Sequence, residues 1–363
     1  MALQCGIVGL PNVGKSTLFN ALTRAEIPAE NYPFCTIDPN VGVVLVPDPR
    51  VDEIAAIVQP KEIVHTAMEF VDIAGLVSGA SRGEGLGNKF LAHIREVDAI
   101  AHIVRCFDDP DIAHVTGGVD PLSDVEIINT ELALADEEAV ERALERTGRK
   151  GRAGDKDALA VANLLERVRD HLDEGNPARS LGLKPEERAQ LAELQLLTLK
   201  PVLYVANIEE AADHDNAYVH ALEARAAAEN ADIVVICAAI EAEIAQLDDA
   251  DKAEFLADID ETEPGLNRVI RAAYHLLDLG TFFTTGEKQA RAWTFRHGMK
   301  APQVAGRIHT DFEKGFIRAE VVNYQDFVAL GGELGAKEAG KWRLEGKDYV
   351  VQEGDVIFFR FNV

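Results

Sequence analysis

Residues 9 to 16 of this chain read Gly-Leu-Pro-Asn-Val-Gly-Lys-Ser, and no other segment constrains the fold as strongly. An apolar run that includes Cys5, Ile7 and Val8 precedes them, and a helix-forming segment, residues 17–22, follows. A glycine-rich turn between a strand and a helix directs several backbone N–H groups at one point, where the helix N-terminus adds partial positive charge. The sequence therefore predicts a strand, a phosphate-binding loop and a helix, and with them the binding of a nucleoside triphosphate.

Individual residues of this loop have predicted roles. Lys15 is expected to reach the β- and γ-phosphates and is assigned a catalytic role, and the Ser16 hydroxyl is expected to ligate Mg²⁺. The remaining loop residues expected at the triphosphate are Asn12, Val13, Gly14 and Thr17. The alternative is a glycine turn that binds nothing, which the strand-then-helix context disfavours.

The composition is that of an ordinary globular chain with an acidic balance. The 363 residues suggest two or three domains, and 47% hydrophobic with 27% charged residues is typical of soluble proteins. No run of 18 apolar residues occurs and no signal peptide precedes the first strand, so we expect a cytoplasmic monomer without a membrane segment. Cys5, Cys106 and Cys237 are expected to be reduced core thiols. Cys35, in a predicted switch loop, is a candidate reactive thiol.

The formal net charge of −26 argues against attraction of nucleic acid to the whole surface. Any contact with RNA must therefore come from local basic patches. Two stretches qualify, residues 146–156 and residues 286–318, the second with a local surplus of positive charge from Lys288 to Arg318. A solvated face without a partner is the alternative for each.

The distribution of apolar runs divides the chain into regions. Short β-rich runs alternate with helical patterns, which indicates an α/β fold with a mostly parallel sheet covered on both faces. These runs are residues 4–8, 41–46, 66–71, 99–106, 201–206 and 233–238. The predicted nucleotide-binding domain comprises residues 1–121 and 200–278. The pattern of residues 122–199 predicts a helical hairpin with a flexible basic tip, Arg146–Lys156. The pattern of residues 279–363 predicts a small, mainly β domain.

Two further elements are expected to meet the γ-phosphate and its metal ion. Asp72 ends an apolar strand and is followed by Gly75, whose N–H is expected at the γ-phosphate, while the Asp72 carboxylate is expected near Mg²⁺. Thr36 is expected to close over both the metal ion and the phosphate. The glycine-rich run after Gly75 is typical of a switch that a ligand orders, and a long surface loop is the alternative.

The choice of base is predicted from residues 207–210. Guanine-specific proteins of this build carry Asn-Lys-x-Asp there, whereas this chain has Asn207, Ile208 and Glu210 at the three defined positions. A carboxylate set one methylene further out cannot form the same bidentate pair with guanine, so ATP is favoured over GTP. Cys237 and Ala238 are expected at the other edge of the base, with a backbone N–H as the contact.

These motifs together resemble those of the Obg-like ATPase family (the YchF group). The resemblance covers the whole chain and rests on the phosphate loop, residues 31–40, Asp72–Leu76, residues 207–210 and the C-terminal segments Lys347–Tyr349, Gly354–Val356 and Phe361–Val363. It implies a G domain of Ras-like fold, an α-helical coiled-coil insertion and a C-terminal TGS domain of β-grasp type. It also implies a preference for ATP and association with ribosomes.

The resemblance also directs attention to the hydrolytic step. Leu76 stands where Ras-like enzymes carry the glutamine that orients the attacking water, so slow intrinsic hydrolysis is expected. In the family a histidine in the loop after the fourth strand is the proposed substitute, and His114 is the matching residue. A solvated loop histidine is the alternative. Asn12 is similar to the asparagine of potassium-dependent relatives, which leaves K⁺ open as a second cation.

The resulting hypothesis is a Mg²⁺-dependent ATPase that acts as a slow switch on the ribosome and modulates translation or a stress response. The predicted contacts with ribosomal RNA are the tip Arg146–Lys156 and the TGS domain. Two alternatives stay open: a GTPase switch of the same architecture, and a nucleotide-gated ribosome-binding protein with incidental hydrolysis. A small-molecule kinase is disfavoured, because no arginine-rich lid is evident.

Overall fold

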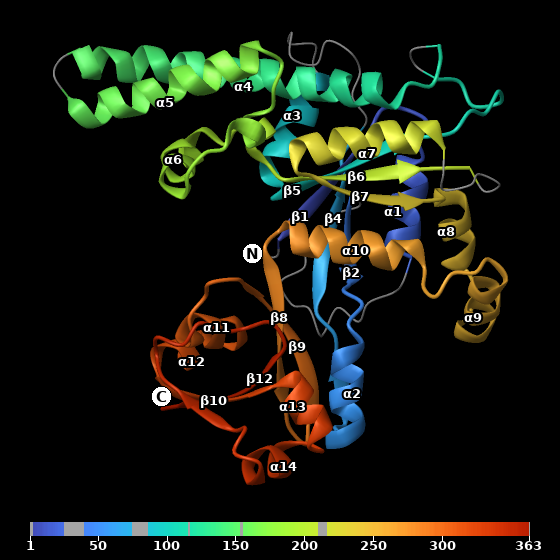
Figure 1. The fold of residues 1–363 in the computed structure, drawn as a ribbon, viewed down its shortest axis with the longest axis vertical. Coiled ribbons are helices and arrows are strands. Elements are labelled where there is room, and N and C mark those ends of the chain that lie inside the picture. Colours follow the sequence, from blue (N-terminus) through green and yellow to red (C-terminus); the bar gives the residue numbers. More distant parts are fainter. Residues whose placement is uncertain are drawn as a thin grey trace.

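The computed structural model describes residues 3–24, 40–74, 86–114, 117–152, 155–209 and 216–362. Two six-stranded sheets form two separate bodies, and a long pair of helices projects from the first of them (Figure 1). Among the described residues, no helix combines the length and the apolar character that a bilayer crossing requires.

The first sheet is the mostly parallel sheet that the sequence predicts. Its strands, in spatial order, are β2 (Val41–Leu45), β4 (Ala67–Asp72), β1 (Gln4–Val8), β5 (Ala99–Arg105), β6 (Val202–Asn207) and β7 (Asp232–Ile236). All neighbouring pairs run parallel except β2 with β4 at one edge. The helices of this region are α1 (Lys15–Leu22), α3 (Leu86–Glu96), α7 (Ala217–Glu229), α8 (Ala238–Ile244), α9 (Asp249–Asp258) and α10 (Gly265–Leu276).

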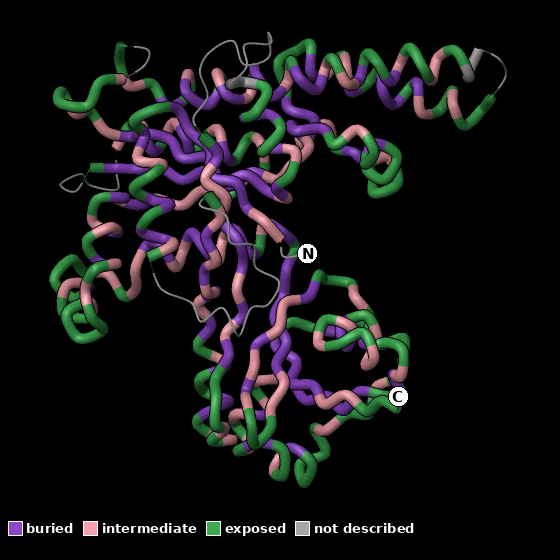
Figure 2. Tube along the Cα trace, turned by 180° about the vertical axis from the view of Figure 1, so that it is seen from behind, coloured by how far each residue is buried: buried purple, intermediate pink, exposed green. Residues whose placement is uncertain are grey.

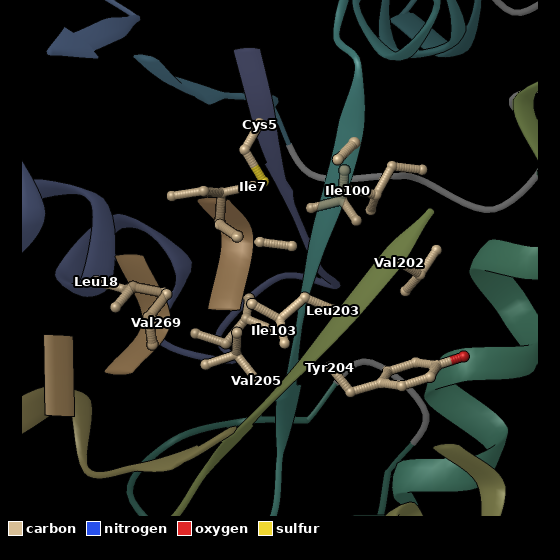
Figure 3. Close-up of a cluster of buried hydrophobic side chains, with 14 of the residues drawn as sticks. Cys5, Ile7, Leu18, Ile100, Ile103, Val202, Leu203, Tyr204, Val205 and Val269 are labelled. Atoms are coloured by element: carbon tan, nitrogen blue, oxygen red, sulfur yellow. The ribbon is translucent and has the colours of Figure 1, made fainter. Parts of the chain in front are cut away.

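The centre of this sheet is buried on both faces. Every residue of β5 and β6 is buried, as expected for continuous apolar strands between two helical layers. Figure 3 shows how side chains of β1, β5 and β6, among them Ile7, Ile103 and Val205, meet Leu18 of α1 and Val269 of α10. This packing fixes the carboxyl ends of β1, β4 and β6, from which the nucleotide-binding residues are expected to project.

The helical insertion lies between β5 and β6. It comprises α4 (Pro121–Arg152), α5 (Lys156–Asp173), η3 (Ala178–Leu181), α6 (Pro185–Leu191), η4 (Ala192–Leu194) and η5 (Leu197–Leu199). The helices α4 and α5 lie side by side (Figure 1) over a separate apolar cluster that includes Val140, Leu165 and Val168. The basic stretch is helical for longer than the sequence suggests, because α4 continues to Arg152. A glycine inside a helix costs only about 1 kcal/mol, which helix-forming neighbours offset.

The second sheet has the order β11-β10-β12-β8-β9-β3. Its C-terminal elements are β8 (Leu279–Thr285), β9 (Gln289–Arg296), α11 (Ala301–Ile308), α12 (Thr310–Lys314), β10 (Phe316–Asn323), α13 (Tyr324–Ala329), α14 (Glu333–Glu338), β11 (Arg343–Glu345) and β12 (Asp355–Phe361). Two elements from the N-terminal part of the chain join them: α2 (Pro49–Val58) and β3 (Glu62–Val64), which runs parallel to β9. The predicted domain that begins at residue 279 therefore lacks two elements of this body. The strand β3 pairs with β9, and α2 packs against the same sheet.

Polar contacts fasten α2 and the β3–β4 connection to the second sheet. Arg50 at the start of α2 bonds to Asp48 at 2.7 Å and to Glu353 at 2.6 Å. The hydroxyls of Thr66 and Thr294 lie 2.5 Å apart, and Tyr274 of α10 donates to Thr294 at 3.2 Å. Figure 2 shows that buried and half-buried stretches alternate where the chain passes from the first sheet into the second. The strand that carries Asp72 belongs to the first sheet, and Thr66, the residue before it, contacts the second sheet.

Candidate functional site

The phosphate loop joins β1 to α1 as the sequence predicts. Asn12 and Gly14 have positive φ angles of 64° and 95°. A Cβ atom on Gly14 would lie 2.4 Å from the Asn207 side chain, so only glycine fits there. Gly14 precedes α1 without a side-chain cap, and the backbone N–H groups of the first turn are consequently left for an anion.

Lys15 and Asp72 meet at this loop. The Lys15 Nζ donates to Asp72 Oδ1 at the end of β4, and their side chains are 11% and 22% exposed. Ser16 and Thr17, in the first turn of α1, are exposed. An ammonium, a carboxylate and a hydroxyl therefore gather at one accessible point. The oxygen donors of Ser16 and Asp72 are of the hard type that Mg²⁺ prefers, so these residues fit the expected metal ion.

Asn207 at the end of β6 connects three segments of the site. Its Nδ2 donates to the Val13 carbonyl at 2.9 Å, and its Oδ1 accepts from the Ala238 N–H at 2.9 Å. Both ends of this buried amide are engaged within the protein. Asn207 therefore holds the phosphate loop against the β7–α8 connection, and the Ala238 N–H that we expected at the base already has a protein partner.

Ile208 and Cys237 lie next to a cavity of about 230 Å³ between the first sheet, α8 and α9. Ile208 is buried and its N–H donates to Ile236, whereas Cys237 is half-buried. The predicted site residues Thr36, Gly75 and Glu210 lie outside the described residues, as do Cys35 and Leu76. Their assignments stay predictions.

The loop after β5 is organised by Arg105, which our sequence reasoning missed. Its guanidinium is fully buried and donates to the carbonyls of Phe107 at 3.0 Å, Asp109 at 3.1 Å and Ile112 at 3.0 Å. It also lies 4.7 Å from the centre of the Phe107 ring. The available signal was an arginine at the end of an otherwise apolar strand, where burial requires that its donors be satisfied.

His114, in the same loop, is not a solvated histidine. Its Nε2 lies 3.0 Å from Asp124 Oδ2 in the first turn of α4, and the two side chains are 4% and 3% exposed. The neighbouring Ala113 carbonyl accepts from Asn12 Nδ2 at 3.1 Å. The structure thus brings the backbone of this loop to the phosphate loop but turns the His114 imidazole toward α4.

Comparison with known proteins gives the family. A model described as "50S ribosome-binding GTPase" matches residues 4–143, and a YchF C-terminal model described as "Protein of unknown function (DUF933)" matches residues 279–362. The chain is 60% identical over 363 residues to a protein of Haemophilus influenzae named "Ribosome-binding ATPase YchF", with all of both chains covered. The chain belongs to the YchF family.

Other YchF proteins support the same conclusion. A Bacillus subtilis relative named "Ribosome-binding ATPase YchF" is 56% identical over 366 residues and is also fully covered. The solved structure titled "Structure of the Schizosaccharomyces pombe YchF GTPase" has a TM-score of 0.89 and 38% identity, with 99% of this chain and 98% of that chain covered. The YchF likeness therefore confirms both the predicted family and the Ras-like fold with its additional regions. The printed names differ over the nucleotide, ATP or GTP.

Proposed function

We propose that this chain is a Mg²⁺-dependent ATPase that works as a slow, nucleotide-dependent switch on the ribosome. The observation that carries the proposal is the meeting of Lys15 and Asp72 at the mouth of a phosphate loop whose backbone N–H groups converge. The names of the YchF relatives support hydrolysis and ribosome binding. We further propose that the protein acts in the cytoplasm as a monomer.

The proposed chemistry assigns a task to each residue at the phosphate loop. Lys15 neutralises charge on the β- and γ-phosphates, and the N–H groups at the start of α1 hold the phosphate oxygens. Ser16, Asp72 and Thr36 are the residues that would hold Mg²⁺, which when bound offsets charge on the transferred phosphoryl group. K⁺ is a second possible cation, because Asn12 is similar to the asparagine of potassium-dependent relatives. Hydrolysis measured with and without potassium salts tests this.

The proposed preference for ATP rests on residues 207–210. Asn207 is engaged with Val13 and Ala238 and positions the loop rather than selecting the base. Selection then depends on the segment Ile208–Glu210, where neither the lysine nor the aspartate of guanine-specific proteins is present. Loss of a charged, bidentate hydrogen-bond pair weakens guanine binding by about a hundredfold or more.

The test is a titration of the purified protein with slowly hydrolysed analogues of ATP and GTP, each with Mg²⁺ and each with and without ribosomes. We expect the ATP analogue to bind at least about tenfold more tightly. Equal or tighter binding of the GTP analogue would contradict the base assignment and favour the GTPase alternative. Failure to bind either analogue would remove the whole proposal.

A second candidate is a nucleotide-gated ribosome-binding protein whose hydrolysis is incidental. The position of His114 favours it, because the imidazole that is proposed to orient water is bonded to Asp124. Turnover that stays negligible with ribosomes, together with ribosome binding that depends on ATP, would establish this second candidate. In either case the proposed ribosome contacts are the tip Arg146–Lys156 and the TGS domain, including its basic stretch Lys288–Arg318.

A further inference from the structure

The pair His114–Asp124 joins the loop after β5 to the helical insertion. His114 lies in the loop that Arg105 holds against the first sheet, and Asp124 belongs to the first turn of α4, the start of the helical insertion. The two side chains are almost completely buried and 3.0 Å apart. A displacement of the first turn of α4 therefore moves Asp124 relative to the His114 imidazole.

The loop itself is fixed close to the phosphate site. Arg105 bonds to three of its carbonyl groups, and Asn12 of the phosphate loop bonds to Ala113 at 3.1 Å. The His114 backbone is thus tethered next to the phosphate loop while its imidazole lies on the α4 side. Release of the imidazole from Asp124 therefore leaves the His114 backbone beside the phosphate loop.

The partner of His114 is incompletely satisfied. Asp124 Oδ2 bonds to His114, but among the described residues the buried Oδ1 has no hydrogen-bond partner. Burial raises the pKa of Asp124 above its usual value, while the bond to His114 acts in the opposite direction. A desolvated carboxylate with one unpaired oxygen regains hydration when it is exposed. Hydration of the Asp124 carboxylate therefore offsets part of the cost of opening the pair.

The helix α4 connects this pair to a distant surface. Its 32 residues span about 48 Å and end at the basic tip. Val125, Ile128 and Leu132, which follow Asp124, are part of the core of the first sheet, so the start of α4 is packed rather than loose. A force on the hairpin is therefore transmitted to a packed turn that contains Asp124.

We propose that Asp124 is a positioning residue that holds His114 away from the phosphate site, and that displacement of the first turn of α4 by a partner bound to the hairpin releases it. This inference rests on the proposed function, in which His114 orients the attacking water. Asp124 itself touches neither substrate nor water in the reaction. The nucleotide site and the hairpin are thereby coupled through one hydrogen bond.

The first experiment measures single-turnover hydrolysis of ATP by the variants Asp124→Asn and Asp124→Ala. We expect turnover to rise by about two- to tenfold, more for Ala than for Asn, since one hydrogen bond to a charged group is lost. The Kd for ATP should not change. Asp120→Asn is the matched control, because this exposed aspartate caps the same helix and asparagine caps equally well.

The second readout is the accessibility of His114, measured as carbethoxylation by diethyl pyrocarbonate with peptide mapping. We expect slow modification in the unaltered protein and faster modification in Asp124→Ala and in the ribosome-bound protein. The exposed His309 should react equally in all samples without ribosomes, and it is not a control for the ribosome-bound sample because it lies in the basic stretch proposed to contact the ribosome. Unchanged modification of His114 in both Asp124 variants would overturn the inference.

The two proposals can fail separately. In the background His114→Ala, the substitution Asp124→Ala should no longer raise turnover. If His114→Ala lowers turnover but the Asp124 variants change neither turnover nor modification, the role of Asp124 is wrong and the role of His114 stands. If the Asp124 variants expose His114 without any rise in turnover, and His114→Ala also has no effect, the catalytic role of His114 is wrong and the inference fails with it.

Discussion

The phosphate loop and the loop after β5 each contribute one member of an acid–base pair, and the two pairs differ in burial. Lys15 and Asp72 are 11% and 22% exposed at the mouth of the phosphate site. His114 and Asp124 are 4% and 3% exposed between the first sheet and the helical insertion. The first pair joins the start of α1 to the end of β4 in the first sheet, whereas the second joins the loop after β5 to the helical insertion.

This difference in burial predicts a difference in response to a ligand. Partners of an accessible pair can be exchanged for a phosphate and a metal ion without movement of the backbone, because both groups already contact water. A buried pair opens only when the elements around it move. We therefore expect nucleotide binding to depend on the first pair and not on the second, whereas the rate of hydrolysis should depend on both pairs.

The largest effect is expected from Lys15→Ala, which breaks the accessible pair. Turnover of ATP should fall by at least about a hundredfold, because no other cationic side chain is predicted at the β- and γ-phosphates. Binding of ATP should weaken as well, as measured by titration. The control is Lys89→Ala, an exposed lysine on α3. Turnover retained by Lys15→Ala would show that the phosphate loop does not carry the chemistry.

The next effect is expected from His114→Ala, which breaks the buried pair. Single-turnover hydrolysis should fall by about 10- to 100-fold with an unchanged Kd for ATP. His93→Ala, an exposed histidine on α3, is the control. A variant with full turnover would return His114 to a structural role.

The same substitution carries a prediction about stability. His114→Ala leaves the Asp124 carboxylate buried without its partner, so the free energy of unfolding should decrease by about 1–3 kcal/mol at neutral pH. The double variant His114→Ala/Asp124→Ala should recover part of that loss, because it removes the uncompensated charge. Denaturant unfolding of the two variants measures both values.

The accessible pair could largely be predicted from sequence, and the buried pair could not. The strand, loop and helix around Lys15 follow from a contiguous motif, and Asp72 follows from an acid placed directly after an apolar strand. Asn207 was found in the same way at the end of β6, although its bonds to Val13 and Ala238 were not. A feature that depends only on residues adjacent in the chain can be predicted from a single sequence.

Contacts between residues far apart in the chain could not be predicted from the sequence in this way. The burial of Arg105 depends on how the loop after β5 folds over it, and the partner of His114 lies in a different element. The attachment of α2 and β3 to the second sheet depends on a parallel pairing of Glu62–Val64 with residues 289–291. Such pairings are decided by tertiary packing, which overrides local pattern.

A moderate effect is expected at the far end of α4. The double variant Arg146→Glu/Arg149→Glu should weaken co-sedimentation with ribosomes by about tenfold at physiological salt, because two phosphate contacts become repulsive. Its affinity for ATP should not change. Both arginines are exposed, and Arg169→Glu, a half-buried position near the other end of α5, is the control. Equal pelleting of the variant and the unaltered protein would remove the tip from the ribosome contact.

The smallest effect is expected at Cys237, beside the proposed base site. Burial raises the pKa of Cys5 and of Cys106 to about 12, so few thiolates form there and N-ethylmaleimide should leave both unlabelled at neutral pH. Cys237 is half-buried and should be labelled. We expect ATP to slow this labelling by about two- to fivefold, whereas Lys15→Ala should reduce the protection because it weakens ATP binding. Peptide mapping separates the thiols, and labelling of Cys237 at the same rate with saturating ATP would place the base away from the β7–α8 connection, on the other side of Asn207.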